Sequence, residues 1–438
     1  MLLVAGVVFA ALAGTDLFMT ALAILNRRHE ERVLPGEREW VEQRLGVEDV
    51  DELLDYQRAT TGTALLRSWV LLAGVLLVLY GGLYGDLVRA LGSTGLPPLA
   101  RGVILVAGAL LAYRLVAVPF DLFETFVVEE TFGFNNQTPA LWLRDLVVGT
   151  AVTLVIALPV SAVLFWFVGA TPLWWLAGWA LAVALLVGLQ VLLPRVVYPL
   201  FYEFAPLEEG DLRRAVEAVF DRAGFTCEQV YEMDASRRSS HTNAFFVGFG
   251  PAKRVVLYDT LIEGMAPAEV QGVLAHELAH WKKGHIWKFV ALGALQFLVI
   301  FAALGALVAW TPLYATFGMP PDATEAGALL AFVVVGQVYQ LTAPLSNLLS
   351  LRFERQADRF AVETVGSEPM AGALSNLAAE NLAELFPHPW YERFHYDHPP
   401  IPERIRYVRE WGESGVGPGT DGTGGGPQDA AGSAGSAD

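Results

Sequence analysis

Seven long apolar segments constrain the fold of this 438-residue chain more than any other feature. A helix needs roughly 20 mostly apolar residues to cross the hydrocarbon core of a bilayer. Segments of that kind are Leu2–Leu25, Ala64–Tyr84, Gly102–Phe120, Leu146–Val168, Leu173–Leu193, Trp287–Trp310 and Gly327–Leu349. Only 17% of the residues are charged, whereas soluble domains carry about 25%. The sequence therefore predicts a mainly α, polytopic membrane protein.

The arginines predict how these spans are oriented. Six arginines lie in the connection 27–63, whereas the connections 169–172 and 311–326 contain no Lys or Arg. Loops rich in Lys and Arg stay in the cytoplasm, so we expect 27–63 to be cytoplasmic and the N-terminus to lie outside. Counting crossings puts three further segments on the cytoplasmic side, namely 121–145, 194–286 and 350–438.

The charge balance excludes one class of partner. Acidic residues outnumber basic ones 46 to 29, which gives a net charge of −17, so the chain has no general affinity for nucleic acid. The few lysines and the acidic surface suggest a prokaryotic source with a salt-rich cytoplasm, although a GC-rich genome would favour arginine in the same way. Cys227 is the only cysteine, which excludes an intrachain disulfide and a thiolate metal cluster.

The soluble parts of the chain alternate with the spans. We expect a helix over Leu207–Ala223, short strands over Gln229–Met233, Asn243–Phe249 and Arg254–Tyr258, and a helix that begins at Pro267. The predicted organisation is a membrane region (1–203), a cytoplasmic unit (204–286), spans six and seven (287–350), a second cytoplasmic part of that unit (351–411) and a disordered tail (412–438).

The helix that begins at Pro267 contains the sequence His276-Glu277-Leu278-Ala279-His280. The spacing i, i+4 places both imidazoles on one helical face, where they can chelate a single zinc ion. Glu277 lies beside them, in position to take a proton from the water that zinc activates. The alternative is a helix with two surface histidines and no metal.

A catalytic zinc needs a third protein ligand, and the sequence Glu354-Arg355-Gln356-Ala357-Asp358 offers one. Glu354 can complete the ligand set, and Asp358, one turn later, can hold the second nitrogen of a ligand histidine. Two spans separate the two motifs, so both lie on the same side of the membrane. The alternative is an ordinary acidic pair in a juxtamembrane helix.

Two other polar residues near or within the spans have no assigned role. His285 follows a glycine at the membrane end of the zinc-binding helix, and we interpret it as a solvated, interfacial histidine rather than a competing ligand. Asp16 lies within the first span, where an ionisable group is costly and suggests a function. Such a function would place it facing a hydrated interior, and hydrogen bonding between packed helices is the alternative.

Taken together, these motifs resemble the integral-membrane CaaX prenyl protease 1 family of zinc metalloproteases. The resemblance runs along nearly the whole chain before the tail. It includes seven spans and, besides the two zinc motifs, the stretches Glu129–Asn135, Pro199–Phe201, Pro206–Gly210, Ser240–Phe246, and His398–Pro400 with Arg404.

The resemblance implies a fold and a set of site residues. Seven transmembrane helices would surround a chamber, and a small α+β, gluzincin-type unit would hold one zinc ion. Asn243 and Ala244 would bind the substrate by adding its backbone to the edge of a sheet. His398 would stabilise the tetrahedral intermediate, and Arg404 would anchor that segment at the substrate site.

The resemblance therefore implies a zinc endopeptidase for membrane-associated or C-terminally prenylated (CaaX-type) proteins. Its partners would be membrane lipids and a peptide or protein substrate, which eukaryotic members of the family cleave in prenylated form. Two alternatives stay open. One is a protease for the quality control of membrane proteins, and the other is a catalytically silent scaffold with a structural zinc. Structural zinc has four protein ligands, so a fourth ligand such as His285 or His398 would favour the scaffold.

Overall fold

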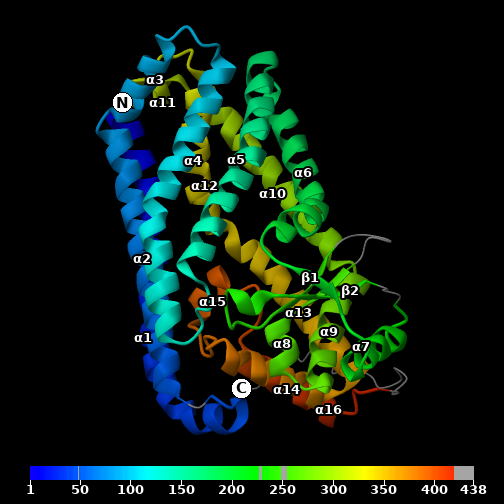
Figure 1. Cartoon of the computed structure of the whole chain (residues 1–438). Coiled ribbons are helices and arrows are strands. Elements are labelled where there is room, and N and C mark those ends of the chain that lie inside the picture. The colour runs from blue at the N-terminus through cyan, green and yellow to red at the C-terminus, as the bar shows by residue number, and fades with distance from the viewer. Residues whose placement is uncertain (48, 226–228, 248–253, 419–438) are drawn as a thin grey trace, which may run out of the picture.

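The computed structural model describes residues 1–47, 49–225, 229–247 and 254–418, and long helices dominate it (Figure 1). Among these residues, seven helical stretches are long and apolar enough to cross a membrane, which confirms the seven predicted spans. They are α1 (Leu2–Leu45), α2 (Val50–Tyr80), α4 (Pro98–Phe123), α5 (Pro139–Ala170), α6 (Trp174–Leu192), α10 (His285–Val308), and α12 (Thr324–Tyr339) with its continuation α13 (Ala343–Val365). The short helices α3 (Leu83–Gly92) and α11 (Thr311–Thr316) connect spans at the end away from the sheet.

Helix α1 continues far beyond the predicted first span. Its 44 residues correspond to about 66 Å, roughly twice the thickness of the hydrocarbon core. Leu34, Val41 and Leu45 are buried in the core of the soluble unit, so part of the connection 27–63 belongs to that core. The helix ends where Gly46 adopts φ 72°, a conformation that favours glycine.

The seventh span is interrupted. Residues Gln340–Thr342 form a single 3₁₀ turn (η6) between α12 and α13. Pro344 follows in the first turn of α13, where its missing N–H costs no intrahelical hydrogen bond. The break separates the apolar part of the span from the part of α13 that carries Glu354 and Asp358.

Asp16 is buried between helices. Its carboxylate accepts a hydrogen bond from Ser68 of α2 and one of 2.5 Å from Gln337 of α12. Only 7% of the residue is exposed. Of the two alternatives for Asp16, the structure supports hydrogen bonding between packed helices, because polar side chains from two neighbouring helices satisfy its oxygens.

A four-stranded sheet lies at one end of the helices. It contains β1 (Phe204–Pro206), β2 (Val230–Met233), β3 (Ala244–Val247) and β4 (Arg254–Tyr258) in the order β1-β2-β4-β3. β2 and β4 are parallel, and the other two pairs are antiparallel. Three strands were predicted from the sequence, except that residues 248–249 of the predicted strand Asn243–Phe249 lie outside the described residues. β1 was not predicted, and β3 forms one edge of the sheet.

The soluble unit is completed by helices α7 (Asp211–Arg222), α8 (Asp259–Gly264), α9 (Pro267–Lys282), α14 (Ser367–Glu380), α15 (Pro389–His395) and α16 (Ile401–Glu413). Pro267 is the first residue of α9, as predicted, and Glu269 accepts a hydrogen bond from the Ala266 N–H. Short irregular helices lie elsewhere: η1 (Glu124–Glu129), η2 (Leu193–Val197), η3 (Tyr198–Leu200) and η4 (Ala235–Arg237). α16 includes the first two residues of the predicted tail, whose residues 419–438 lie outside the described part.

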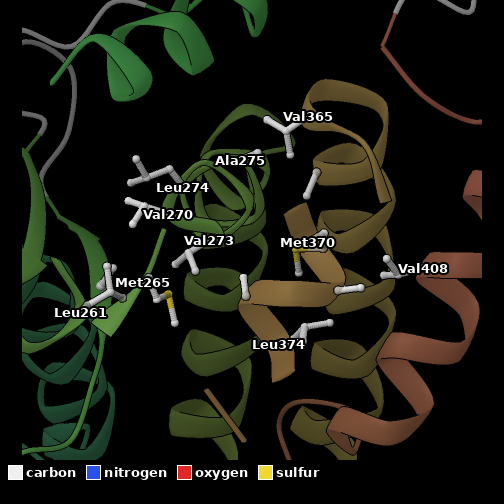
Figure 2. Close-up of a cluster of buried hydrophobic side chains, with 14 of the residues drawn as sticks. Leu261, Met265, Val270, Val273, Leu274, Ala275, Val365, Met370, Leu374 and Val408 are labelled. Atoms are coloured by element: carbon white, nitrogen blue, oxygen red, sulfur yellow. The ribbon is translucent and has the colours of Figure 1, made fainter. Parts of the chain in front are cut away.

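Helix α9 is the centre of the hydrophobic core (Figure 2). It packs against α13, α14 and α7. Val270, Leu274 and Leu278 are fully buried on it. A Cβ at Gly272 would lie 2.9 Å from the Pro369 carbonyl oxygen, so the glycine allows α9 and α14 to approach closely. The helix that carries both histidines is thus held rigidly on several sides.

Candidate metal centre and active site

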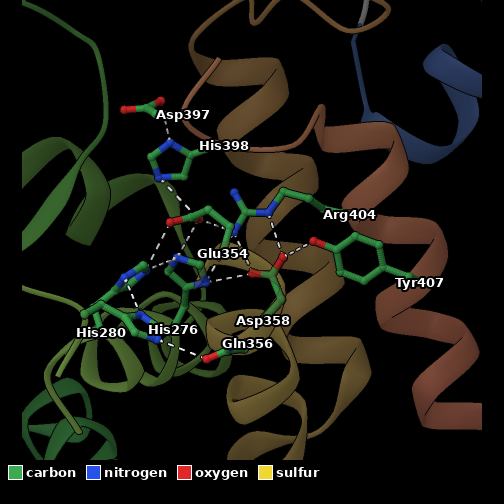
Figure 3. Close-up of polar contacts among 10 residues, drawn as sticks. His276, His280, Glu354, Gln356, Asp358, Asp397, His398, Arg404 and Tyr407 are labelled. Carbon is green, nitrogen blue, oxygen red and sulfur yellow. Dashed lines mark hydrogen bonds and ion pairs between the residues drawn. The ribbon is translucent and has the colours of Figure 1, made fainter. Parts of the chain in front are cut away.

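Helix α9 presents the two histidines of the His-Glu-x-x-His sequence on one face. The Nε2 atoms of His276 and His280 lie 3.2 Å apart. Glu354 projects towards them from α13, with Oε2 3.2 Å from His276 Nε2 and Oε1 3.2 Å from His280 Nε2 (Figure 3). One ligand atom from each of these three residues lies within 4.8 Å of the others, so the two motifs form a single cluster.

This donor set fits a divalent cation. Glu354 is 2% exposed, and its Oε2 makes no hydrogen bond with any described residue despite the nearby His276 ring nitrogen. A buried carboxylate oxygen without a partner is costly unless a cation binds it. Two histidines and one glutamate are a ligand set of catalytic zinc sites. Glu277, Glu354 and Asp358 also carry more negative charge than Arg404 neutralises.

Asp358 is fully buried and orients the first of the two histidines. Its Oδ1 lies 2.7 Å from His276 Nδ1 and accepts a hydrogen bond of 2.6 Å from Arg404 Nη2. Its Oδ2 accepts hydrogen bonds from Arg404 Nε, at 2.9 Å, and from the Tyr407 hydroxyl. Burial alone would lower the pKa of His276, but the carboxylates of Asp358 and Glu354 raise it to about 10. The site therefore stabilises positive charge next to His276.

A pocket of about 410 Å³ lies against this cluster. It brings together most of the predicted site residues: Asn243, Ala244, His276, Glu277, His398 and Arg404. Apolar side chains of α9 and α14 form much of the remaining wall, among them Val273, Met370, Leu374 and Leu377. The pocket is thus a mostly apolar site with a few convergent polar groups, which is typical of a substrate site.

The comparisons with known proteins agree with this geometry. Residues 206–412 match Peptidase family M48, and residues 25–203 match the CAAX prenyl protease N-terminal region of five membrane helices. The CAAX prenyl protease 1 homolog of Arabidopsis thaliana is 34% identical over 349 residues, which cover 79% of this chain and 82% of the relative. The chain belongs to the CAAX prenyl protease 1 family. It is a membrane metallo-endopeptidase.

Other similar proteins support the same family and fold. The CAAX prenyl protease 1 of Saccharomyces cerevisiae is 32% identical, with 68% of this chain and 70% of the relative covered. The human CAAX prenyl protease 1 homolog is 31% identical, with 77% and 80% covered. A crystal structure of Ste24p from S. mikatae has a TM-score of 0.81 at 24% identity and covers 92% of this chain and 98% of that chain. That likeness shows that the fold is shared.

Two residues of this family member have surroundings that the sequence did not indicate. The His398 side chain is 51% exposed, and its Nε2 lies 3.3 Å from Glu354 Oε2. Its Nδ1 lies 2.8 Å from Asp397 Oδ1, and this hydrogen bond lowers the pKa of Asp397. Arg404, expected at the substrate site, lines the pocket but is 7% exposed and binds Asp358.

Sequence reasoning missed or misread four residues around the CAAX protease site. The interpretation of His285 as solvated is wrong, because the residue is fully buried against His280 and Phe353. Tyr407 follows Arg404 by three residues on one helical face, a spacing that could have indicated a shared partner. Gln356 and Asp397 each lie within two residues of a predicted site residue, but nothing in their spacing distinguishes them from surface residues.

Proposed function

We propose that this chain is a zinc-dependent endopeptidase that hydrolyses peptide bonds of membrane-associated or C-terminally prenylated, CaaX-type proteins. The observation that carries the proposal is the pocket, in which Glu277 lies beside the three-residue cluster and near the free edge of the sheet. The names of the relatives, which are CAAX prenyl proteases, support the prenylated class of substrate.

In this proposal His276, His280 and Glu354 hold the metal, and Glu277 moves the proton. When bound there, zinc would polarise the scissile carbonyl and make a water molecule acidic enough to be deprotonated near neutral pH. Glu277 is half-buried in the pocket wall and accepts the proton of the attacking water as general base. It then passes this proton to the leaving amine.

His398 stabilises the oxygen that becomes negatively charged during the reaction. The Asp397 carboxylate accepts a hydrogen bond from His398 Nδ1 and orients the imidazole ring. Nε2 of the same ring is directed towards the metal cluster, where it can donate to the oxyanion (Figure 3). The exposure of His398 leaves room for this ring to adjust to the substrate.

The edge strand β3 binds the substrate backbone. Tyr258 N–H donates a hydrogen bond of 3.1 Å to the Asn243 carbonyl oxygen, so Asn243 belongs to a hydrogen-bonded pair with β4. Hydrogen-bonded and non-hydrogen-bonded pairs alternate along an antiparallel ladder. The main-chain groups of Ala244 and Phe246 therefore face away from β4, at the edge of the sheet where no other described strand pairs. Asn243 Oδ1 already accepts from Ala244 N–H, at 2.8 Å, which leaves the Ala244 carbonyl and the Phe246 N–H for a substrate strand.

We also propose that the site lies on the cytoplasmic side of the membrane and opens into a chamber between the helices, with the N-terminus outside. The arginine-rich connection 27–63 supports this orientation. Substrates would then reach the pocket from the cytoplasm or laterally from that leaflet. Protection of 204–286 from protease in sealed, right-side-out vesicles would support this topology, and cleavage there would contradict it.

The experiment that tests the reaction compares Glu277→Gln with Glu263→Gln in purified protein. Glu263 is exposed on α8, so its variant is a matched control for the loss of one carboxylate. We expect Glu277→Gln to retain zinc and lose cleavage of a peptide substrate, because the change removes the base but no ligand. Wild-type cleavage by this variant would refute the mechanism.

A second comparison tests the class of substrate. The same peptide is presented to the wild-type protein with and without a C-terminal prenyl group. A strong dependence of cleavage on the prenyl group supports CaaX processing. Equal cleavage of both peptides would refute that class and favour quality control of membrane proteins.

A further inference from the structure

The second histidine of the cluster has a partner of its own. His280 Nδ1 lies 3.2 Å from His285 Nδ1, and His285 Nε2 lies 3.2 Å from Gln356 Oε1. These contacts run from the last turn of α9 to the first residue of α10 and then to α13. His276 is held by Asp358 in a corresponding way, but there the acceptor is a carboxylate.

The chain turn that brings His285 back onto His280 depends on one glycine. Gly284, between α9 and α10, has φ 65°, a conformation that other residues rarely adopt. His285 is then completely buried, and its ring stacks on Phe353 with a centroid distance of 4.0 Å and an interplanar angle of 7°. The position and the plane of this imidazole are therefore both fixed.

The hydrogen bonds allow only one arrangement of protons when His280 binds a metal through Nε2. Nε2 then carries no proton, so the His280 proton is on Nδ1, and this N–H donates a hydrogen bond to His285 Nδ1. The latter nitrogen must be an acceptor, which puts the His285 proton on Nε2. Gln356 Oε1 accepts that proton, so every group in the series donates or accepts as its chemistry requires.

We infer that His285 is a positioning residue that, with Gln356, selects the Nδ1–H tautomer of His280 and fixes the orientation of its ring. This inference rests on the metal site of the proposed function. It also assigns a purpose to the neutral partner. Glu277, Glu354 and Asp358 already place three carboxylates near the metal position, and Gln356 accepts the His285 proton without adding a fourth negative charge.

Two variants test this role without relying on peptidase activity. His285→Phe keeps an aromatic ring that can stack on Phe353 but removes the acceptor for His280. Gln356→Leu keeps His285 and removes its acceptor, and it serves if His285→Phe does not fold. His395→Phe is the control, because His395 contacts the Tyr391 carbonyl oxygen, outside the cluster.

The readouts are the zinc dissociation constant, measured against a competing chelator, and the visible absorption spectrum after cobalt substitution. We expect His285→Phe to weaken zinc binding by about 10- to 100-fold and to change the cobalt spectrum, Gln356→Leu to do so less strongly, and His395→Phe to match the wild type. The variant Gln356→Glu, which keeps an acceptor, should retain more affinity than Gln356→Leu.

Wild-type zinc affinity and an unchanged cobalt spectrum in folded His285→Phe would overturn the inference. If instead Gln356→Leu alone folds, its wild-type affinity and spectrum would overturn it. Failure of the wild-type protein itself to bind zinc would refute the metal site of the proposed function. The two failures are therefore distinguishable.

Discussion

His276 Nδ1 and Asp358 Oδ1 lie 2.7 Å apart, although 82 residues and two spans separate them in the sequence. Arg404, from a third part of the chain, binds the same carboxylate through two nitrogen atoms. Both Asp358 and Arg404 are buried, so the opposite charge of each compensates the other for its loss of hydration. The pair holds α9, α13 and α16 together at the point where the metal would bind.

The first prediction concerns Asp358→Asn. The change removes the anionic partner of His276 and leaves the Arg404 guanidinium buried without its counter-charge. We expect zinc affinity to fall about 10- to 100-fold. We also expect a loss of stability of about 3–5 kcal/mol, the range seen when one partner of a buried pair is removed. Zinc titration and thermal unfolding in detergent measure the two effects.

The exposed carboxylate of Asp51 provides the control for this prediction. Asp51→Asn removes a charge from a pair with Arg38 at the surface, where ion pairs contribute little to stability. That variant should keep wild-type zinc affinity and unfolding temperature. Unchanged zinc binding in folded Asp358→Asn would mean that the hydrogen bond to His276 does not matter for the metal.

The second prediction separates a catalytic site from a structural one. His398 is close enough to Glu354 that the scaffold alternative makes it a fourth zinc ligand. If His398 acts on the oxyanion instead, His398→Ala should retain one zinc per chain and lower kcat about 100-fold or more. Metal analysis after dialysis, together with peptide cleavage, measures both. Loss of zinc with the fold intact would support the scaffold.

The ligands could be predicted from sequence because local spacing carries the information. His276 and His280 share a helical face by their i, i+4 spacing alone, and hydropathy marks the two spans that bring Glu354 back to the same side. The small sheet was largely predicted as well, because its strands are short apolar runs between turns. Its order, which leaves β3 at the edge, follows from packing that no local pattern shows.

Other features depend on contacts between distant parts of the chain. The long extension of α1 into the soluble core was missed, because its apolar residues are interspersed with charges and resemble a solvated linker. The burial of His285 depends on the backbone of Gly284 and on Phe353, which lies 68 residues further along the chain in α13. The surroundings of Asp16 stayed open for the same reason, since its partners come from α2 and α12.

The third prediction concerns the pH dependence of stability near the pocket wall. Glu384 hydrogen-bonds with Glu30 of α1, Asn26 and Tyr396, and burial raises the pKa of Glu384 above its ordinary value despite these hydrogen bonds. A carboxyl group whose pKa is raised in the folded state contributes stability that is fully present below its pKa in the unfolded chain. This contribution is lost as the pH rises through the folded-state pKa. We therefore expect Glu384→Gln to be more stable than the wild type at pH 8.

The difference between Glu384→Gln and wild type should shrink as the pH is lowered from 8 towards the ordinary pKa of a carboxyl group, because the wild-type carboxyl regains its proton. Unfolding temperature at each pH measures it. Glu380→Gln is the matched control, since Glu380 is exposed at the end of α14 and should show no such trend. A constant difference across this pH range would contradict the prediction.

The last prediction tests how the substrate is held. If its backbone pairs with the Ala244 carbonyl and the Phe246 N–H at the free edge of β3, only every second substrate residue faces that edge. N-methylation of a peptide N–H that faces β3 should then abolish cleavage, because the methyl group removes the donor to Ala244. Methylation of the neighbouring N–H should leave most of the cleavage. A series of peptides methylated at one position each, with unchanged side chains, measures kcat/KM for every position. The expected result is an alternation with a period of two residues. A uniform loss at every position, or no loss at any, would show that β3 does not bind the substrate as an added strand.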